Sequence, residues 1–343
     1  MAAHCSLRKL DLRNFRRACF SSAWMTVTRL SSRRRCDPLM SWAHTAKLAA
    51  VHDEGVQMPV PDDRAVALCR ILLRLQLRRL REAAGLKASA VAKMYGWSTA
   101  RMTRLETKDN AVEVGDVRLL CDLYGASAEL REELEGYALV TKTRKDWYET
   151  APFKGTVPSW FSAYLGLESA ANEIRIYQAE FVPGLAQDPE YAMAILGLSD
   201  ASDATVELHA EVRLKRQSIL TRDKDAPRVS IVLNEGVIRR PVGDAMRKQL
   251  EAINSLADRP NITVQVLPFS AGAHPAMHGP FTILSFVDET LGDLAYLENR
   301  VDGGVLSDPD LVAPFIETFS TLEQLAATPE HSMKMIRDAA AAL

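Results

Sequence analysis

The stretch RLREAAGLKASAVAKMYGWSTARMTRLET, residues 79–107, decides the fold of the first half of the chain. Gly85 can end a helix, because a residue without a Cβ tolerates the left-handed backbone found at helix C-termini. Gly96 stands where a tight turn would join two short helices, near 88–95 and 99–107. Ser98 can cap the second of these through its hydroxyl. The stretch therefore predicts two short helices joined by a tight turn.

Further helices are predicted on both sides of this stretch. Apolar residues recur three and four positions apart from Val66 to Leu80, the stripe of an amphipathic helix that Asp62 or Asp63 can cap. Downstream, helices are expected at about 114–124 and about 128–140. The same periods place Met94 and Leu119 on inward faces. Residues 62–140 are thus predicted to form an all-α domain of five short helices.

Charge is distributed unevenly along the 343 residues, although the net charge is only −2. Residues 64–125 hold 12 Lys and Arg against 6 Asp and Glu, whereas residues 126–343 hold 20 against 32. A basic block before an acidic body suggests that only the first meets a polyanion. No apolar run approaches the roughly 18–20 residues of a membrane helix, so no membrane partner is expected.

The five cysteines form no CxxC pair, which predicts neither a disulfide framework nor a zinc site. Reduced thiols in a cytoplasmic protein are the interpretation that fits best. Cys69 and Cys121 fall within predicted amphipathic helices and are expected to be small core residues.

Residues 1–61 differ from the rest in being rich in Arg and Ser, without a sustained helical or strand period. Their composition is similar to that of an organelle transit peptide and of a basic arm for DNA phosphates. The interpretation we favour is translated upstream sequence from a misassigned start, with Met58 as the true beginning. In each case we expect the segment to be disordered.

Residues 141–343 are predicted to form an α/β or α+β domain around one sheet, because strands in the middle are flanked by helices. A connector rich in aromatic residues comes first, at about 141–165. Strands are expected at about 174–181, 228–233, 261–268, 281–287 and 293–298. Helices are expected at about 162–172, 189–196, 203–221, 243–257, 309–326 and 329–342.

Residues 79–107 resemble the helix-turn-helix of phage-repressor (XRE) type. Small Ala92 lies where the two helices would cross, Gly96 is in the turn, and Ser98 to Glu106 resembles the recognition helix. In that family an arginine late in the first helix pairs with a glutamate that closes the third. Arg81 and Glu106 occupy those places, so the resemblance implies a structural ion pair.

The resemblance implies a sequence-specific transcription regulator whose third helix, about Thr99–Thr107, enters the major groove of double-stranded DNA. Arginine can bond guanine O6 and N7 bidentately, and threonine and alanine methyls can touch a thymine methyl. Further basic side chains would neutralise phosphates. The DNA-binding residues predicted in this way are Ser98, Thr99, Ala100, Arg101, Thr103, Arg104, Lys87, Lys93 and Arg78.

One difference from the phage-repressor family affects the expected specificity for DNA. The family usually opens its second helix with Thr-Gln, the glutamine contacting DNA, whereas this chain has Lys87-Ala88. A capping hydroxyl and one DNA contact are lost, so the site preference of relatives cannot be transferred.

Long stretches of the second half resemble the C-terminal domain of actinomycete regulators. They are IRIYQAEFVPGLAQDPEYAMAIL, VLNEGVIRRPVG, NITVQVLPFSAGAHPAMHGPFTILSF and AYLENRVDGGVLSDPD. These regulators are described as antitoxin-like and include developmental regulators of the WhiJ kind. The resemblance implies a partner, a small protein encoded by a neighbouring gene. One helix-turn-helix reads about half a site, so a homodimer is also expected.

The sequence also bears on functions other than transcription regulation. His274 and His278 have metal-like spacing but lie in a Gly/Pro-rich loop, so we expect turn histidines, no metal and no cofactor. Asp308 and Asp310 are expected to cap a helix near Pro309. No Gly-x-Ser-x-Gly elbow is present and we expect no enzyme, although a catalytic domain fused to a DNA-binding module stays open. The main alternative is an interaction protein that sequesters a toxin-like partner, with DNA binding for autoregulation.

Overall fold

A computed structural model describes residues 65–107, 112–199, 202–287, 291–299 and 302–343 of the chain. The predictions for residues 1–61, and for capping by Asp62 or Asp63, lie outside the described residues. Among the helices that are described, none combines the length and the apolar character needed to cross a membrane.

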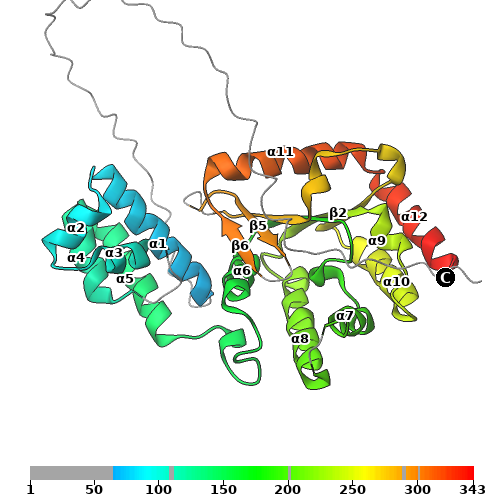
Figure 1. Cartoon of the computed structure of the whole chain (residues 1–343), viewed down its shortest axis with the longest axis horizontal. Coiled ribbons are helices and arrows are strands. Elements are labelled where there is room, and N and C mark those ends of the chain that lie inside the picture. The colour runs from blue at the N-terminus through cyan, green and yellow to red at the C-terminus, as the bar shows by residue number, and fades with distance from the viewer. Residues whose placement is uncertain (1–64, 108–111, 200–201, 288–290, 300–301) are drawn as a thin grey trace, which may run out of the picture. The chain divides into compact units, whose positions relative to one another are not determined.

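Five helices form the first part of the described chain (Figure 1). They are α1 (Val66–Ala83), α2 (Ala88–Met94), α3 (Thr99–Thr107), α4 (Val114–Tyr124) and α5 (Ala128–Thr143). Gly85 and Gly125 follow α1 and α4 with φ of 68° and 73°, a conformation that strains residues with a Cβ. Leu72, Val91, Met102, Leu120 and Leu134 fill the core between these helices.

Two of the predicted inward residues are exposed. Met94 keeps 60% of its surface accessible and Leu119 keeps 45%. In α2 the core positions are occupied by Val91 and Ala92, and in α4 by Leu120. Cys69 and Cys121 are buried in the core, as predicted. Burial raises the pKa of the Cys121 thiol to about 11.

The first turn of α1 is capped from a distant part of the sequence. The carboxylate of Asp146 accepts hydrogen bonds from the backbone N–H groups of Val66 (2.9 Å) and Ala67 (3.0 Å). Tyr148 also donates to this carboxylate, at 2.7 Å. Asp146 begins the short turn η2 (Trp147–Glu149) after α5, and Glu149 of that turn pairs with Arg70 of α1. The aromatic connector is therefore packed on α1 and does not act as a free linker.

One six-stranded sheet organises the second part of the chain, in the order β3-β2-β1-β4-β5-β6. Strands β1 (Glu173–Gln178), β2 (Arg228–Asn234) and β3 (Ile262–Leu267) are parallel. Strands β4 (Phe281–Ser285), β5 (Leu294–Glu298) and β6 (Gly303–Leu306) add antiparallel neighbours beyond β1. The direction in which strands are added reverses between β1 and β4.

Helices cover both faces of this sheet. Alternate residues of a strand point to opposite faces, and they belong to two different hydrophobic clusters. Ile174 and Ile176 of β1 pack in the larger cluster, which includes residues of α10 (Ala245–Ala257) and α12 (Pro329–Ala341). Tyr177 belongs to the smaller cluster, beneath Phe319 of α11 (Pro309–Leu325). The remaining helices are α6 (Ser159–Ala170), α7 (Pro189–Leu196), α8 (Asp203–Arg216) and α9 (Glu235–Arg239). A helical region followed by an α+β domain around one sheet was the predicted fold class, and it is confirmed.

Strand β6 was not predicted, because Gly303 and Gly304 open it and glycine disfavours strands. A Cβ at Gly303 would lie 2.7 Å from Trp160 Cε3, so the close approach of this strand to α6 requires glycine.

Candidate DNA interface

Helices α2 and α3 are joined by a four-residue turn, Tyr95–Ser98. Gly96 adopts φ of 65°, and the Trp97 N–H donates to the carbonyl of Ala92 at 2.8 Å. The Ser98 hydroxyl accepts from the N–H of Arg101 at 3.1 Å, so this serine caps α3. The geometry is that of a helix-turn-helix.

Helix α3 is fixed to α1 by a buried ion pair and a core methionine. Arg81 Nε and Nη2 donate to the two carboxylate oxygens of Glu106 at 2.5 and 2.9 Å, and Nη1 donates to the Leu86 carbonyl at 2.8 Å. The hydrogen bond to Glu106 raises the pKa of Arg81 although burial opposes its charge. Met102 is fully buried. Together these contacts set which face of α3 is left outward.

The outward face of α3 carries Thr99, Ala100, Thr103 and Arg104, all of which are exposed. At about 100° per residue these four positions span an arc of roughly 140°, opposite Met102. The Thr103 hydroxyl donates to the carbonyl of Thr99 at 3.0 Å, within the helix. Among the described residues, no hydrogen bond or ion pair engages the Arg104 guanidinium. No described residue therefore competes for the donors of Arg104.

Arg101 lies at the edge of this face and is held there. Its Nη2 donates to Asp116 of α4 at 2.7 Å, and its guanidinium lies 4.3 Å from the ring centroid of Trp97. The Arg101 side chain is 43% exposed, whereas Asp116 is 15% exposed. Bidentate contact with a guanine would require this side chain to leave Asp116, so its position differs from the free base-reading arginine that the sequence predicted.

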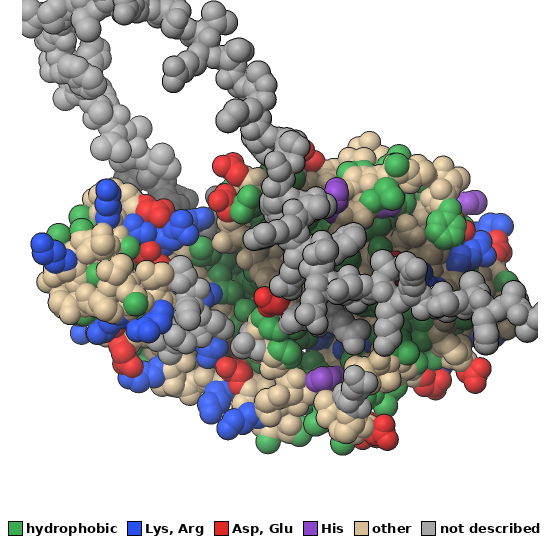
Figure 2. Space-filling view, viewed as in Figure 1, with side chains coloured by type: hydrophobic (Ala, Val, Ile, Leu, Met, Phe, Trp, Pro, Cys, Tyr) green, Lys and Arg blue, Asp and Glu red, His purple; other side chains and the backbone are tan. Residues whose placement is uncertain are grey.

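The three flanking cations predicted for phosphate contact, Lys87, Lys93 and Arg78, are exposed. Lys87 immediately precedes α2, and Lys93 belongs to its last turn. Arg78 Nε donates to Glu82 at 2.9 Å within α1, an exposed pair that solvent screens and that can exchange partners readily. Lysine and arginine side chains are visible on the surface of this helical region (Figure 2).

Sequence reasoning missed Asp116 and Trp97, the two residues that position Arg101. Asp116 is 15 residues from Arg101 along the chain and meets it only because α4 packs beside α3. No local pattern indicates that contact. Trp97 gave a weak signal, because an aromatic residue in a tight turn four positions before an arginine can serve as a platform for a cation.

The histidine loop of the second region was interpreted as a turn. His274 precedes the short 3₁₀ turn η6 (Pro275–His278) and His278 is its last residue, and the His274 ring packs edge-on to Tyr177 at 5.8 Å between ring centroids. In the part of the chain that the structure describes, no group of three or more potential ligands could hold a metal ion. Asp308 accepts from the N–H of Asp310 at 3.1 Å and so caps α11.

Comparison with known families agrees with this geometry. Residues 72–134 match a family model described as a helix-turn-helix domain, so the first region is of that DNA-binding class. Residues 161–338, more than half of the chain, match a model described as a domain of unknown function, DUF5753. The chain belongs to the DUF5753 family. Searches among curated proteins and among solved structures gave no match.

Proposed function

We propose that this protein is a sequence-specific, DNA-binding transcription regulator that reads its operator with the outward face of α3. The observation that carries the proposal is the combination of a helix-turn-helix with an exposed face of two threonines, an alanine and an arginine that no described residue engages. Hydroxyl, methyl and guanidinium groups are the groups that read base edges in the major groove.

The roles of the site residues follow from their positions. Arg104 would bond a guanine, and Thr99, Ala100 and Thr103 would contact bases or nearby phosphates. Lys87, Lys93 and Arg78 would neutralise phosphates and make the affinity salt-dependent. Arg101 has donors left over while it is paired with Asp116, and these suit a phosphate better than a base.

A homodimer is part of the proposal, because one α3 reads about half a site and two are needed for useful affinity. We further propose that the protein acts in the cytoplasm as a binding protein and not as an enzyme. The buried Cys121, which forms no disulfide with a described residue, is in keeping with a reducing compartment.

The second region is proposed to hold a partner other than DNA. Its acidic balance, 20 basic against 32 acidic residues from 126 to 343, disfavours contact with phosphates. The resemblance to antitoxin-like regulators of the WhiJ kind makes a small protein from a neighbouring gene one candidate. If sequestering that protein is the main task, the second region will bind it tightly while affinity for DNA changes little.

The test is a mobility-shift and footprinting experiment with the full chain on the DNA upstream of its own gene. We expect a protected site that persists against excess non-specific DNA. The double substitution Arg101→Ala with Arg104→Ala should abolish this specific binding and leave the helical circular dichroism unchanged. Arg228→Ala is the matched control, because Arg228 is 74% exposed and lies on β2.

Specific protection that survives the double substitution would overturn the assignment of α3. Sedimentation of the free protein and of the complex tests the dimer, for which we expect two chains per site.

A further inference from the structure

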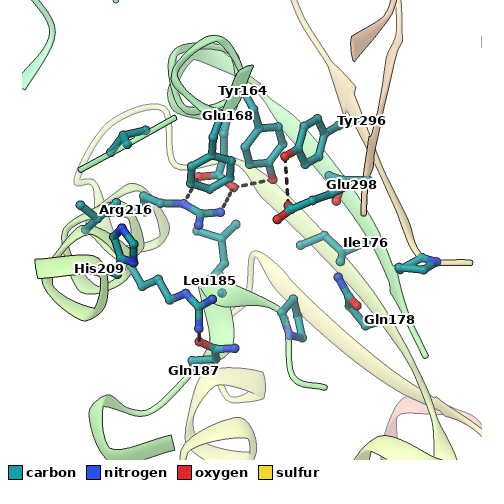
Figure 3. Close-up of a pocket in the computed structure, with 18 of the residues that line it drawn as sticks. Tyr164, Glu168, Ile176, Gln178, Leu185, Gln187, His209, Arg216, Tyr296 and Glu298 are labelled. Atoms are coloured by element: carbon teal, nitrogen blue, oxygen red, sulfur yellow. Dashed lines mark hydrogen bonds and ion pairs between the residues drawn. The ribbon is translucent and has the colours of Figure 1, made fainter. Parts of the chain in front are cut away.

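A pocket in the α+β domain lies over the sheet where strand addition reverses, between β1 and β4. It has a volume of about 210 Å³, and its floor includes Ile176 and Gln178 of β1 with Phe281 and Thr282 of β4. Helices α6 and α8 and strand β5 supply further walls, including Tyr164, Arg216 and Tyr296 (Figure 3). In open, mainly parallel α/β sheets, ligands bind at such a reversal outside the carboxyl ends of the strands. Here β1 presents its carboxyl end and the antiparallel strand β4 its amino end. Gln178 is the last residue of β1.

Aromatic rings make one wall of this pocket. Tyr164 and Tyr296 stack at 4.0 Å between ring centroids, and Phe161 stacks on Tyr164 at 5.5 Å. Trp160 also lines the pocket and meets Phe161 edge-on at 5.7 Å. An apolar cavity of about 150 Å³ holds benzene. The pocket is therefore large enough for a ligand of one or two rings.

Two arginines of α8 line the same pocket, and only one of them forms an ion pair with a described residue. Arg216 donates to both carboxylate oxygens of the buried Glu168 at 2.8 Å. Burial opposes the charge of Arg216, but Glu168 raises its pKa overall. Tyr164 donates to the same carboxylate at 2.6 Å, so Glu168 is fully occupied.

Arg213 forms no ion pair with a described residue, although the carboxylate of Glu298, which also lines the pocket, is near enough to favour its charge. Its Nη1 donates to the amide oxygen of Gln187 at 2.7 Å, a neutral acceptor. Burial, with Arg216 as a like charge, lowers the pKa of Arg213 to about 10, which leaves the guanidinium charged at neutral pH. Since Glu298 makes no direct ion pair with Arg213, the desolvated guanidinium lacks a charged hydrogen-bond acceptor, and an anion bound directly to it would recover part of the cost of burial.

Gln178 supplies a second polar group that lacks a partner among the described residues. Gln178 lines the pocket, and its Oε1 is buried and accepts no hydrogen bond from any described residue. A buried acceptor without a donor is rare in native proteins and suggests that a ligand satisfies it.

We propose that this pocket binds an aromatic acid of one or two rings, with its carboxylate on Arg213, its ring against Tyr164 and Tyr296, and an N–H or O–H donated to Gln178. The proposal stands on the pocket alone and does not depend on DNA binding.

The test uses isothermal titration calorimetry of the full chain with three indole probes. Indole-3-acetate carries the ring, the carboxylate and an N–H, indole-3-acetamide lacks the charge, and 1-methylindole-3-acetate lacks the N–H. We expect saturable binding of indole-3-acetate, at least about tenfold weaker binding of the amide, and binding of the methylated acid weaker by several-fold.

Substitutions assign these differences to residues. Arg213→Gln should reduce the affinity for indole-3-acetate to that of the amide, and Gln178→Leu should remove the preference for the N–H. Arg259→Gln is the matched control, because Arg259 is exposed at the end of α10 and does not line the pocket. Thermal unfolding of each variant checks that it folds.

Equal affinity of the unsubstituted chain for the acid and the amide would overturn the proposal, and this comparison needs no variant. Absence of saturable binding by indole-3-acetate would overturn it as well.

Discussion

Arg104 on α3 and Arg213 on α8 carry the same guanidinium in opposite surroundings. Arg104 is exposed and engages no described residue, whereas Arg213 lines a pocket, donates to a neutral amide and forms no ion pair with a described residue. An exposed cation suits a large, hydrated polyanion, since little water is lost until the duplex arrives. A desolvated cation suits a small anion that fits the pocket and excludes water. The environment, and not the residue type, therefore separates a nucleic-acid surface from a small-molecule site.

Within the α+β domain, a buried and an exposed ion pair are expected to differ in what they contribute to stability. Glu168→Ala should lower the free energy of unfolding of the α+β domain by about 3–5 kcal/mol, because it leaves Arg216 buried without its partner. Urea unfolding followed by circular dichroism measures this. Glu173→Ala is the control, since its partner Arg228 is 74% exposed, and it should cost less than about 1 kcal/mol. Similar losses for both would show that burial does not distinguish the two pairs.

A smaller loss of stability is expected when the cap that Asp146 of the connector gives to α1 is removed. Asp146→Ala removes the acceptor for the Val66 and Ala67 N–H groups and should cost about 1–2 kcal/mol. Asp146→Asn keeps one oxygen acceptor and should cost less. The midpoint of thermal unfolding reports the difference, and an unchanged midpoint for both variants would mean that solvent replaces the cap at no cost.

The proposed phosphate contacts are expected to change the salt dependence more than the sequence preference. Lys87→Ala and Lys93→Ala should each reduce the slope of log affinity against log salt by about 1 and weaken specific and non-specific DNA alike. Binding measured over a salt series gives the slope. If either substitution changes the base preference while the slope stays the same, that lysine reads bases instead.

The smallest effect concerns Arg101. Asp116→Asn removes the charge that holds this arginine and should strengthen DNA binding by a few-fold, corresponding to about 0.3–1 kcal/mol. The same substitution in the Arg101→Ala background should have a weaker effect, which a double-mutant cycle detects. Equal effects in both backgrounds would show that Asp116 acts only through general repulsion of phosphates.

The sequence predicted most helices and five of the six strands because their apolar residues repeat with the period of each element. Local patterns also identified the Gly96 turn and the Ser98 cap, since both depend on residues within a few positions. Strand β6 was not predicted because the need for glycine at position 303 comes from the close approach of Trp160. That contact is long-range and leaves no local pattern in the sequence.

The candidate sites were predicted unevenly for the same reason. The residues of the α3 face lie within six positions of one another, so a single motif indicates them. The engagement of Arg101 by Asp116 depends on the packing of α4, which no local spacing reveals. The pocket draws on α6, β1, α8, β4 and β5, and Arg213 stands out only when its neighbours from all of these are known.

The central claim is that the outward face of α3 reads bases, with Arg104 bonded to a guanine. The most direct measurement is selection of bound sites from random DNA by the unsubstituted chain and by Arg104→Ala, followed by sequencing. The account predicts that the variant loses preference for guanine at one position in each half-site, at a cost of about 1–3 kcal/mol, and keeps the rest of the motif. An identical motif from both proteins would contradict it.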